Sequence, residues 1–203
     1  IPLGGAIRGP SVARVVESHL AGFEAGDLIF GLHHWEDYSL SDANTVLLSK
    51  LSPEPDIPLS YYSGGLGGSG HTAYVGLHEI GKIQAGETVL ISAAAGATGS
   101  MATQIAKLRG CNVVGIVGSD EKVELVTNTL GADAAVNYKT CGDLAAAISQ
   151  ACPEGVDVYF DNVGGTTLNA ALACMNTFGR VIGCGMRSEE HTSELQSPDH
   201  LVC

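Results

Sequence analysis

The sequence predicts an α/β protein in which helices cover a parallel β-sheet and a smaller β-rich segment precedes that sheet. From residue 88 onward, short apolar runs rich in β-branched residues alternate with helical patterns, which is typical of βαβ units. The first 60 residues contain only short β-type runs broken by turns. A proline-rich stretch at residues 52–58 separates the two regions and marks a boundary.

Composition limits the class of protein and its partners. The chain has 203 residues, of which 45% are hydrophobic, so it can bury the core of one large domain or two smaller ones. A net charge of −12 disfavours nucleic acid and anionic membranes as partners, because both would be repelled. No apolar run has membrane-spanning length. The chain opens without methionine, as a fragment would.

The six cysteines indicate the redox setting. None belongs to a C-x-x-C pair, so neither a zinc knot nor a disulfide framework is indicated. We therefore expect reduced thiols and a cytoplasmic location.

Residues 1–60 are interpreted as part of a small β-barrel. Val12–Val16 and Leu28–Phe30 are β-type runs, and the turn signal at residues 25–27 lies between them. The tail, residues 187–203, is polar and has no period, so we expect it to be disordered or non-native.

Residues 61–186 carry the regular alternation. A glycine-rich turn leads into a helix at residues 72–80, which Gly81 ends. In chain order, the sequence then predicts strand 88–92, helix 97–109, strand 112–117, helix 120–130, strand 134–137, helix 142–151, strand 156–160, helix 166–175 and strand 180–184.

The first strand-to-helix turn of this series, residues 94–99, fits the dinucleotide fingerprint G-x-G-x-x-G with alanine in the first place. Such a turn needs a bare backbone at Gly96 beside a pyrophosphate and no side chain at Gly99, where helix meets strand. The backbone N–H groups of Ala97 and Thr98, at the start of the helix, would be free to bind the phosphates. The pattern predicts a Rossmann-type doubly wound sheet, although close packing alone would also select small residues here.

The end of the second strand indicates which dinucleotide would bind. This strand ends in Gly118-Ser119, without the acidic residue that NAD-binding folds place on the ribose hydroxyls. Lys122 follows within reach of a ribose 2′-phosphate, which favours NADP over NAD. A lysine on a solvated helix face is the alternative interpretation.

Two later strand ends carry further candidates. Tyr138 follows the third strand, where it could contact the adenosine or simply cap the sheet. Asn162 follows the fourth strand, at the edge where ligands bind in such folds; an Asp-Asn turn before glycines is the alternative.

Several motifs in fixed order extend this picture over residues 11–186. They are Gly70-His-Thr-Ala-Tyr74, Ser92-Ala-Ala-Ala-Gly-Ala-Thr-Gly99, Gly118-Ser-Asp-Glu-Lys122, Asn137-Tyr-Lys-Thr140, Phe160-Asp-Asn-Val-Gly-Gly165 and Gly183-Cys-Gly185. This set resembles the prostaglandin reductase and alkenal double-bond reductase branch of the zinc-free medium-chain dehydrogenases/reductases. The resemblance implies a GroES-like N-terminal barrel, of which this chain would hold a remnant, and a homodimeric parent protein.

The resemblance also implies an activity and a set of cofactor contacts. In that family, NADPH delivers a hydride to the β-carbon of an α,β-unsaturated aldehyde or ketone. Carried onto matching positions, Gly96–Gly99 would bind the pyrophosphate, Lys122 and Tyr138 the 2′-phosphate end, and Asn162 and Cys184 the nicotinamide end. No catalytic residue is assigned. The chain departs from the family at His71, where leucine is usual.

Metal catalysis is not expected. His33, His34, His71 and His78 have no cysteine at ligand spacing, so we predict no metal site. Hydride transfer needs none, because the cofactor carries the chemistry.

Other readings remain open. A quinone oxidoreductase of the same superfamily is one alternative, and a truncated NADP-binding module without catalysis is another. Trp35 and Tyr38 could wall a substrate cleft, but we expect them to pack inside the barrel.

Overall fold

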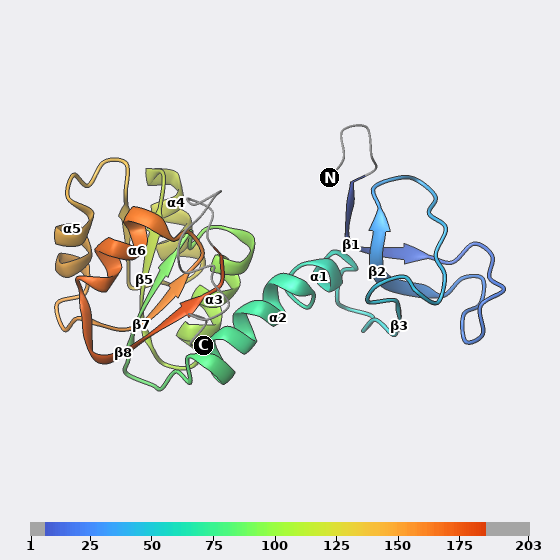
Figure 1. Ribbon diagram of the computed structural model, residues 1–203, viewed down its shortest axis with the longest axis horizontal. Helices are drawn as coiled ribbons and strands as arrows, with labels where there is room; N and C mark the ends of the chain where they lie inside the picture. The colour runs from blue at the N-terminus through green and yellow to red at the C-terminus, as the bar shows by residue number, and fades with distance from the viewer. Residues whose placement is uncertain (1–6, 186–203) are drawn as a thin grey trace, which may run out of the picture. The chain divides into compact units, whose positions relative to one another are not determined.

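The computed structural model describes residues 7–185, which divide into two compact units between His71 and Thr72. Each unit is described by itself. The first holds a three-stranded antiparallel sheet and the second a five-stranded parallel sheet (Figure 1). The α/β fold class predicted from the sequence, with a smaller β-rich part ahead of the parallel sheet, is therefore confirmed.

The antiparallel sheet of the first unit has the strand order β1-β2-β3. Its strands are β1 (Arg8–Arg14), β2 (Leu28–His34) and β3 (Ser49–Leu51), and a short helix, α1 (Ser60–Ser63), follows. The strand predicted at Val12–Val16 thus begins four residues earlier, and the strand predicted at Leu28–Phe30 continues four residues further. Alternate residues of β2 are buried, as expected of a strand with one face toward a core.

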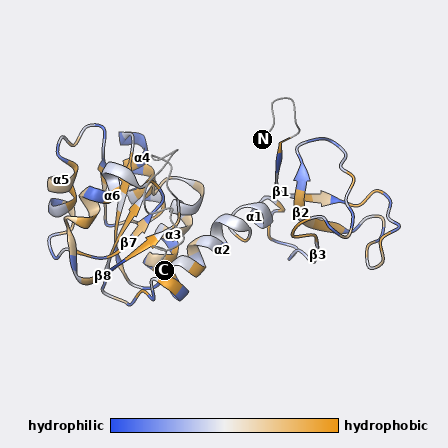
Figure 2. Ribbon diagram, in the orientation of Figure 1, coloured by the Kyte–Doolittle hydropathy of each residue, from blue (hydrophilic) through white to orange (hydrophobic). Residues whose placement is uncertain are grey.

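The parallel sheet of the second unit has the order β6-β5-β4-β7-β8. Its strands are β4 (Thr88–Ser92), β5 (Asn112–Val117), β6 (Ala134–Asn137), β7 (Val156–Asp161) and β8 (Met175–Gly183). The central strand β4 is buried over its whole length, as a strand covered on both faces must be. Figure 2 shows this sheet as mainly hydrophobic.

Helices cover both faces of the parallel sheet. The boundary between the two units lies within α2 (Gly68–Val75). The helical segments that follow it are, in chain order, the π-helical turn η1 (Gly76–Ile80), α3 (Ala97–Leu108), α4 (Asp120–Glu124), the π-helical turn η2 (Leu125–Thr129), α5 (Leu144–Ala151) and α6 (Gly165–Leu172). Ala102 and Ala106 of α3 and Val126 of η2 belong to one buried core, whereas Ile148 of α5 and Ala171 of α6 belong to a second core. The sheet is therefore doubly wound (Figure 1).

Several element ends differ from the sequence prediction. The helix predicted at residues 166–175 ends at Leu172, and β8 already begins at Met175. A register shift separates the β8 residues that face Val156 and Val158, and Phe178 has a positive φ of 64°. Such an irregularity interrupts the alternation on which strand prediction depends.

Two predicted helices also start or continue differently. The helix predicted from residue 142 begins at Leu144, because Gly142 has a φ of 74° and the Asp143 side chain caps the helix by accepting a hydrogen bond from the Ala146 amide. The helix predicted at residues 120–130 is divided into α4 and η2.

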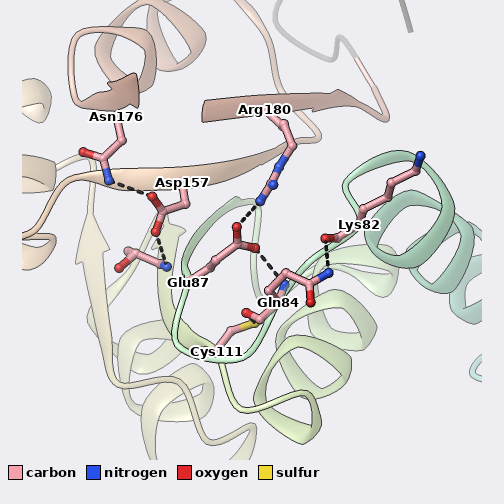
Figure 3. Close-up of polar contacts among 8 residues, drawn as sticks. Lys82, Gln84, Glu87, Cys111, Asp157, Asn176 and Arg180 are labelled. Atoms are coloured by element: carbon pink, nitrogen blue, oxygen red, sulfur yellow. Dashed lines mark hydrogen bonds and ion pairs between the residues drawn. The ribbon is translucent and has the colours of Figure 1, made fainter. Parts of the chain in front are cut away.

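Polar side chains join three strands at the amino-terminal edge of the parallel sheet (Figure 3). The Asp157 carboxylate of β7 accepts hydrogen bonds from the Thr88 amide at 2.9 Å and from Asn176 Nδ2 at 2.8 Å. Arg180 of β8 pairs with Glu87, which directly precedes β4. These contacts join the ends of β4, β7 and β8 at this edge, although the buried Nε atom of Arg180 has no hydrogen-bond partner among the described residues.

The described helices include none that combines the length and the apolar composition needed to cross a membrane.

Candidate functional site

The candidate site lies at the opposite, carboxyl-terminal edge of the parallel sheet. Because all five strands run in one direction, the loops that follow them meet at this edge. The chain order of the strands reverses between β4 and β7, which are neighbours in the sheet. In open α/β sheets, ligands bind in the crevice at such a switch point.

The loop after β4 forms the first part of the site. Gly96 is the N-cap of α3, and the described residues provide no hydrogen-bond partner for the backbone amides of Ala97, Thr98 and Gly99. An anion placed here would find unpaired N–H donors and the positive end of the helix dipole.

Gly99 shows why this loop requires glycine. A Cβ atom at this position would lie 2.2 Å from the Ala93 carbonyl oxygen and 2.9 Å from the Ala94 Cα. Every residue with a Cβ atom would have to displace the backbone here, so only glycine fits. The predicted close contact between helix and strand is thus present.

The next two strand ends bring Gly118 and Tyr138 together. The Tyr138 amide donates to the Val117 carbonyl at 3.0 Å, and a Cβ atom at Gly118 would lie 3.0 Å from the Tyr138 hydroxyl oxygen. The tyrosine ring therefore lies against the bare backbone of Gly118. Half of the Tyr138 side chain remains exposed, so its outer side is accessible to a ligand.

Lys122 lies on α4, beside that strand end. Ser119 is the N-cap of this helix, and its hydroxyl accepts a hydrogen bond from the Lys122 amide. The Lys122 side chain is exposed, and no hydrogen bond or ion pair joins its ammonium group to another residue between 7 and 185. Asp120 of the same helix is engaged instead by Asn137 Nδ2 at 2.7 Å. An exposed lysine with no ion-pair partner among the described residues thus follows the second strand, and its contact with a 2′-phosphate stays a prediction.

A buried hydrogen-bond network joins the ends of β4 and β7. Asp161, which is 3% exposed, places its Oδ1 atom within hydrogen-bond distance of four donors. They are the hydroxyls of Ser92 (3.1 Å) and Tyr159 (2.8 Å) and the amides of Val163 (3.0 Å) and Gly164 (2.9 Å). Burial raises the pKa of Tyr159, so its hydroxyl stays protonated and can donate.

Asn162 and Cys184 lie next to this network. The Asn162 amide donates to Ser92 Oγ at 2.8 Å, and its Nδ2 donates to the Ser92 carbonyl at 2.7 Å. The Asp161 carbonyl accepts from the amides of Cys184 at 2.8 Å and Gly185 at 3.0 Å. Burial, aided by the nearby Asp161 carboxylate, raises the pKa of the Cys184 thiol, which favours its neutral form.

The structure therefore connects some of the sequence candidates and leaves others separate. Asn162 is hydrogen-bonded to Ser92, whose hydroxyl donates to the Asp161 carboxylate, and the Cys184 amide donates to the Asp161 carbonyl. Among residues 7–185, no hydrogen bond links Lys122 or the Tyr138 side chain to this group. Sequence reasoning missed Asp161 itself, because an Asp-Asn pair before glycines is also a common turn. The available signal was a carboxylate at the end of a buried apolar strand.

The first unit contains a groove of about 960 Å³ between β1, β2 and the loop after β2. Trp35 and Tyr38 line this groove, and their side chains are 71% and 81% exposed. The prediction that they pack inside the barrel is therefore wrong. His33 also lines this groove; it is buried, and its Nδ1 atom shares a hydrogen bond with Ser11 Oγ at 2.9 Å.

The described part of the chain has no group of three or more His, Cys, Asp or Glu side chains placed to hold a metal ion. The sequence-based expectation of a zinc-free protein stays a prediction.

The fold and this edge together define an α/β protein of the dinucleotide-binding class. The sequence profile of the family described as "Zinc-binding dehydrogenase" matches residues 97–202, which is more than half of the chain. The chain belongs to this family, in the medium-chain dehydrogenase/reductase branch that contains the prostaglandin, alkenal and curcumin reductases.

Three relatives illustrate the similarity. The 2-alkenal reductase (NADP(+)-dependent) of Nicotiana tabacum is 46% identical over 98% of this chain and 58% of its own length. Prostaglandin reductase 1 of Mus musculus is 50% identical over 92% of this chain and 56% of its own length. The crystal structure of CurA in complex with NADPH from Vibrio vulnificus superposes with a TM-score of 0.78, at 36% identity, over 94% of this chain and 57% of that one. The chain thus spans somewhat more than half the length of these relatives.

Proposed function

We propose that the protein to which this chain corresponds is an NADPH-dependent reductase of the C=C bond in α,β-unsaturated aldehydes and ketones. When bound, NADPH would supply a hydride, which the substrate accepts at its β-carbon while a proton is added at its α-carbon. The observation that carries the proposal is the carboxyl edge of the parallel sheet, where unpaired amides and an unpaired lysine follow adjacent strands. The names of the relatives support the substrate class.

The residues of this edge fit the cofactor. The amides of residues 97–99 and the bare backbone at Gly96 suit the pyrophosphate. Lys122 suits a 2′-phosphate, since no neighbour within the described chain neutralises its charge. Tyr138 would contact the adenosine end through its exposed side. Asn162 and Cys184, at the end of β7 and after β8, would face the nicotinamide half.

Three further parts of the proposal follow from the family. Residues 1–60 would belong to a GroES-like substrate-binding barrel and residues 61–186 to the cofactor domain, and the parent protein would be a homodimer. A cytoplasmic location fits the five described cysteines, all of which are free thiols.

The decisive experiment is a pair of titrations of the 203-residue chain with NADPH and NADH, followed by nicotinamide fluorescence. We expect saturable binding of NADPH and binding of NADH that is at least tenfold weaker, because one charge-assisted contact to the 2′-phosphate is worth about that factor. Lys122→Glu should weaken NADPH binding and leave NADH nearly unchanged. Equal losses for both would contradict the role of Lys122.

Lys82→Glu is the matched control. It makes the same change of charge at an exposed lysine near the amino-terminal edge, beside Gln84 (Figure 3). NADPH affinity should be the same as in the unchanged chain.

A second experiment measures the consumption of NADPH with a small enal and, separately, with a quinone as the substrate. Consumption of NADPH with the enal, by a protein of the relatives' full length, supports the proposal. Turnover of the quinone alone would favour a quinone oxidoreductase. We expect the 203-residue chain to bind NADPH without turnover, as a truncated NADP-binding module would, because it spans only 58% and 56% of the two relatives' lengths.

A further inference from the structure

We propose that Asp161 is a positioning residue that fixes three loops of the carboxyl edge and so aligns Asn162 and Cys184 with the nicotinamide half of the cofactor. This inference rests on the proposed function. It concerns a residue that does not itself touch the cofactor in the proposed arrangement, and it divides the site into two halves that can be tested separately.

The Asp161 side chain holds two of the three loops. Its Oδ1 accepts from the amides of Val163 and Gly164, so the loop after β7 folds back over the carboxylate. The same atom accepts from Ser92 Oγ, at the last residue of β4 and the start of the loop that leads to Gly96. One buried oxygen atom thus joins two strand ends that are 69 residues apart in the chain.

Ser92 connects Asp161 to Asn162 by hydrogen bonds. Its hydroxyl donates to Asp161 and accepts from the Asn162 amide at 2.8 Å, and its carbonyl accepts from Asn162 Nδ2 at 2.7 Å. Backbone and side chain of Asn162 are therefore both oriented by Ser92. A hydroxyl rotates freely unless its proton has an acceptor, and Asp161 supplies the nearer one.

The Asp161 backbone holds the third loop. Its carbonyl accepts from the amides of Cys184 and Gly185, directly after β8. A Cβ atom at Gly185 would lie 3.2 Å from the Asn162 carbonyl oxygen, so this loop runs close against the residue after Asp161. Asp161 therefore orients Asn162 through its side chain and Ser92, and it holds the Cys184 loop through its backbone carbonyl.

The adenosine side is anchored by other groups. The end of β4 also pairs with β5, where Ser92 stands opposite Ile116 and the Ala94 amide donates to the Ile116 carbonyl. Tyr138 is fixed by the Val117 carbonyl. The pyrophosphate and adenosine subsites should thus persist without the Asp161 carboxylate.

The charge and burial of Asp161 suit a positioning role. A buried carboxylate is costly unless donors surround it, and here two hydroxyls and two amides do so. The Tyr159 hydroxyl, from the same face of β7 two residues earlier, completes the set on the inner side. Hydrogen bonds to an ionised acceptor are stronger and more directional than neutral ones, which rigidifies the loops they join.

The test uses Asp161→Ala in the 203-residue chain with two probes, NADPH and adenosine 2′,5′-bisphosphate, which lacks the nicotinamide half. We expect Asp161→Ala to weaken NADPH binding about tenfold or more and to leave binding of the bisphosphate within about twofold. Asp161→Asn keeps an acceptor oxygen and should restore most of the NADPH affinity.

Asp157→Ala is the matched control. It removes a carboxylate from the other end of the same strand, where Asp157 also accepts from a backbone amide and a side chain (Figure 3). This variant should lose thermal stability while its affinity for both probes stays unchanged. If Asp161→Ala does not fold, as judged by circular dichroism, Ser92→Ala replaces it, because that change removes only one of the four donors to Asp161.

The outcomes separate this inference from the proposed function. If the unchanged chain binds neither probe, the proposed function fails. If the chain binds both and Asp161→Ala weakens both equally, or neither, then Asp161 is only structural and the inference is overturned while the function stands.

Discussion

Gly99→Ala is the substitution whose effect follows most directly from the geometry. The new methyl group would stand 2.2 Å from the Ala93 carbonyl oxygen, whereas ordinary contact begins at 3.4 Å. The obstructing atoms belong to the backbone, so no side chain can rotate away. The first turn of α3 must instead withdraw from the end of β4 by about 1 Å.

The free-energy cost can be worked from these contacts. Overpacking costs about 1–3 kcal/mol, and a clash with backbone falls at the upper end of that range. Alanine recovers about 1 kcal/mol of helix propensity relative to glycine. We therefore expect a net loss of about 2 kcal/mol, which lowers the Tm of a chain of this size by roughly 4–8 °C. Withdrawal of the helix N-terminus should also weaken NADPH binding about tenfold.

Thermal unfolding and a fluorescence titration of NADPH measure the two effects. Gly68→Ala is the control, since Gly68 is also a helical residue and its Cβ would meet open space. That variant should be as stable as the unchanged chain or slightly more so. Equal Tm and equal NADPH affinity for Gly99→Ala and Gly68→Ala would refute the steric argument.

Three other outcomes are expected. Gly118→Ala should displace the half-exposed Tyr138 ring and reduce NADPH affinity several-fold with little change in Tm; an unchanged affinity in a titration would count against a contact by Tyr138. Burial opposes ionisation of Asp133, but the hydrogen bond from Lys107 prevails and lowers its pKa, so its stabilising contribution is present above pH 3.8 and lost as the pH falls further. Asp133→Asn should accordingly cost about 1 kcal/mol in urea unfolding at pH 7, and the difference should close in acid; a pH-independent difference would contradict this. Burial raises the pKa of Cys152 to about 11, so a thiol reagent at pH 8 should label this residue only after unfolding, as peptide mass spectrometry would detect.

Periodicity was sufficient to predict the parallel sheet. Strands such as β4 and β5 are short, apolar and β-branched, and each is followed by a helical repeat, so local pattern and tertiary burial agree. The same pattern failed at residues 172–180. There an irregular strand replaces the predicted end of the helix. The positive φ of Phe178 could not be predicted from the sequence, because glycine is the residue that usually marks such a conformation.

The candidate site could be predicted only where neighbouring residues of a single loop form a recognisable motif. The glycines at 96 and 99 and the missing acid after β5 can be read from adjacent residues. The role of Asp161 cannot, because its partner Ser92 lies in another strand and only the sheet order brings them together. The exposure of Trp35 was likewise missed, since aromatic residues beside a predicted barrel are usually packed.

The account depends on a dinucleotide phosphate lying against the first turn of α3, and backbone amide NMR of the 203-residue chain tests this directly. On addition of NADPH, the amide resonances of Ala97, Thr98 and Gly99 should shift in a saturable manner, while that of Gly155, which precedes β7 at the opposite edge, should not. Saturable shifts confined to other parts of the chain, or no shifts at all, would contradict the account.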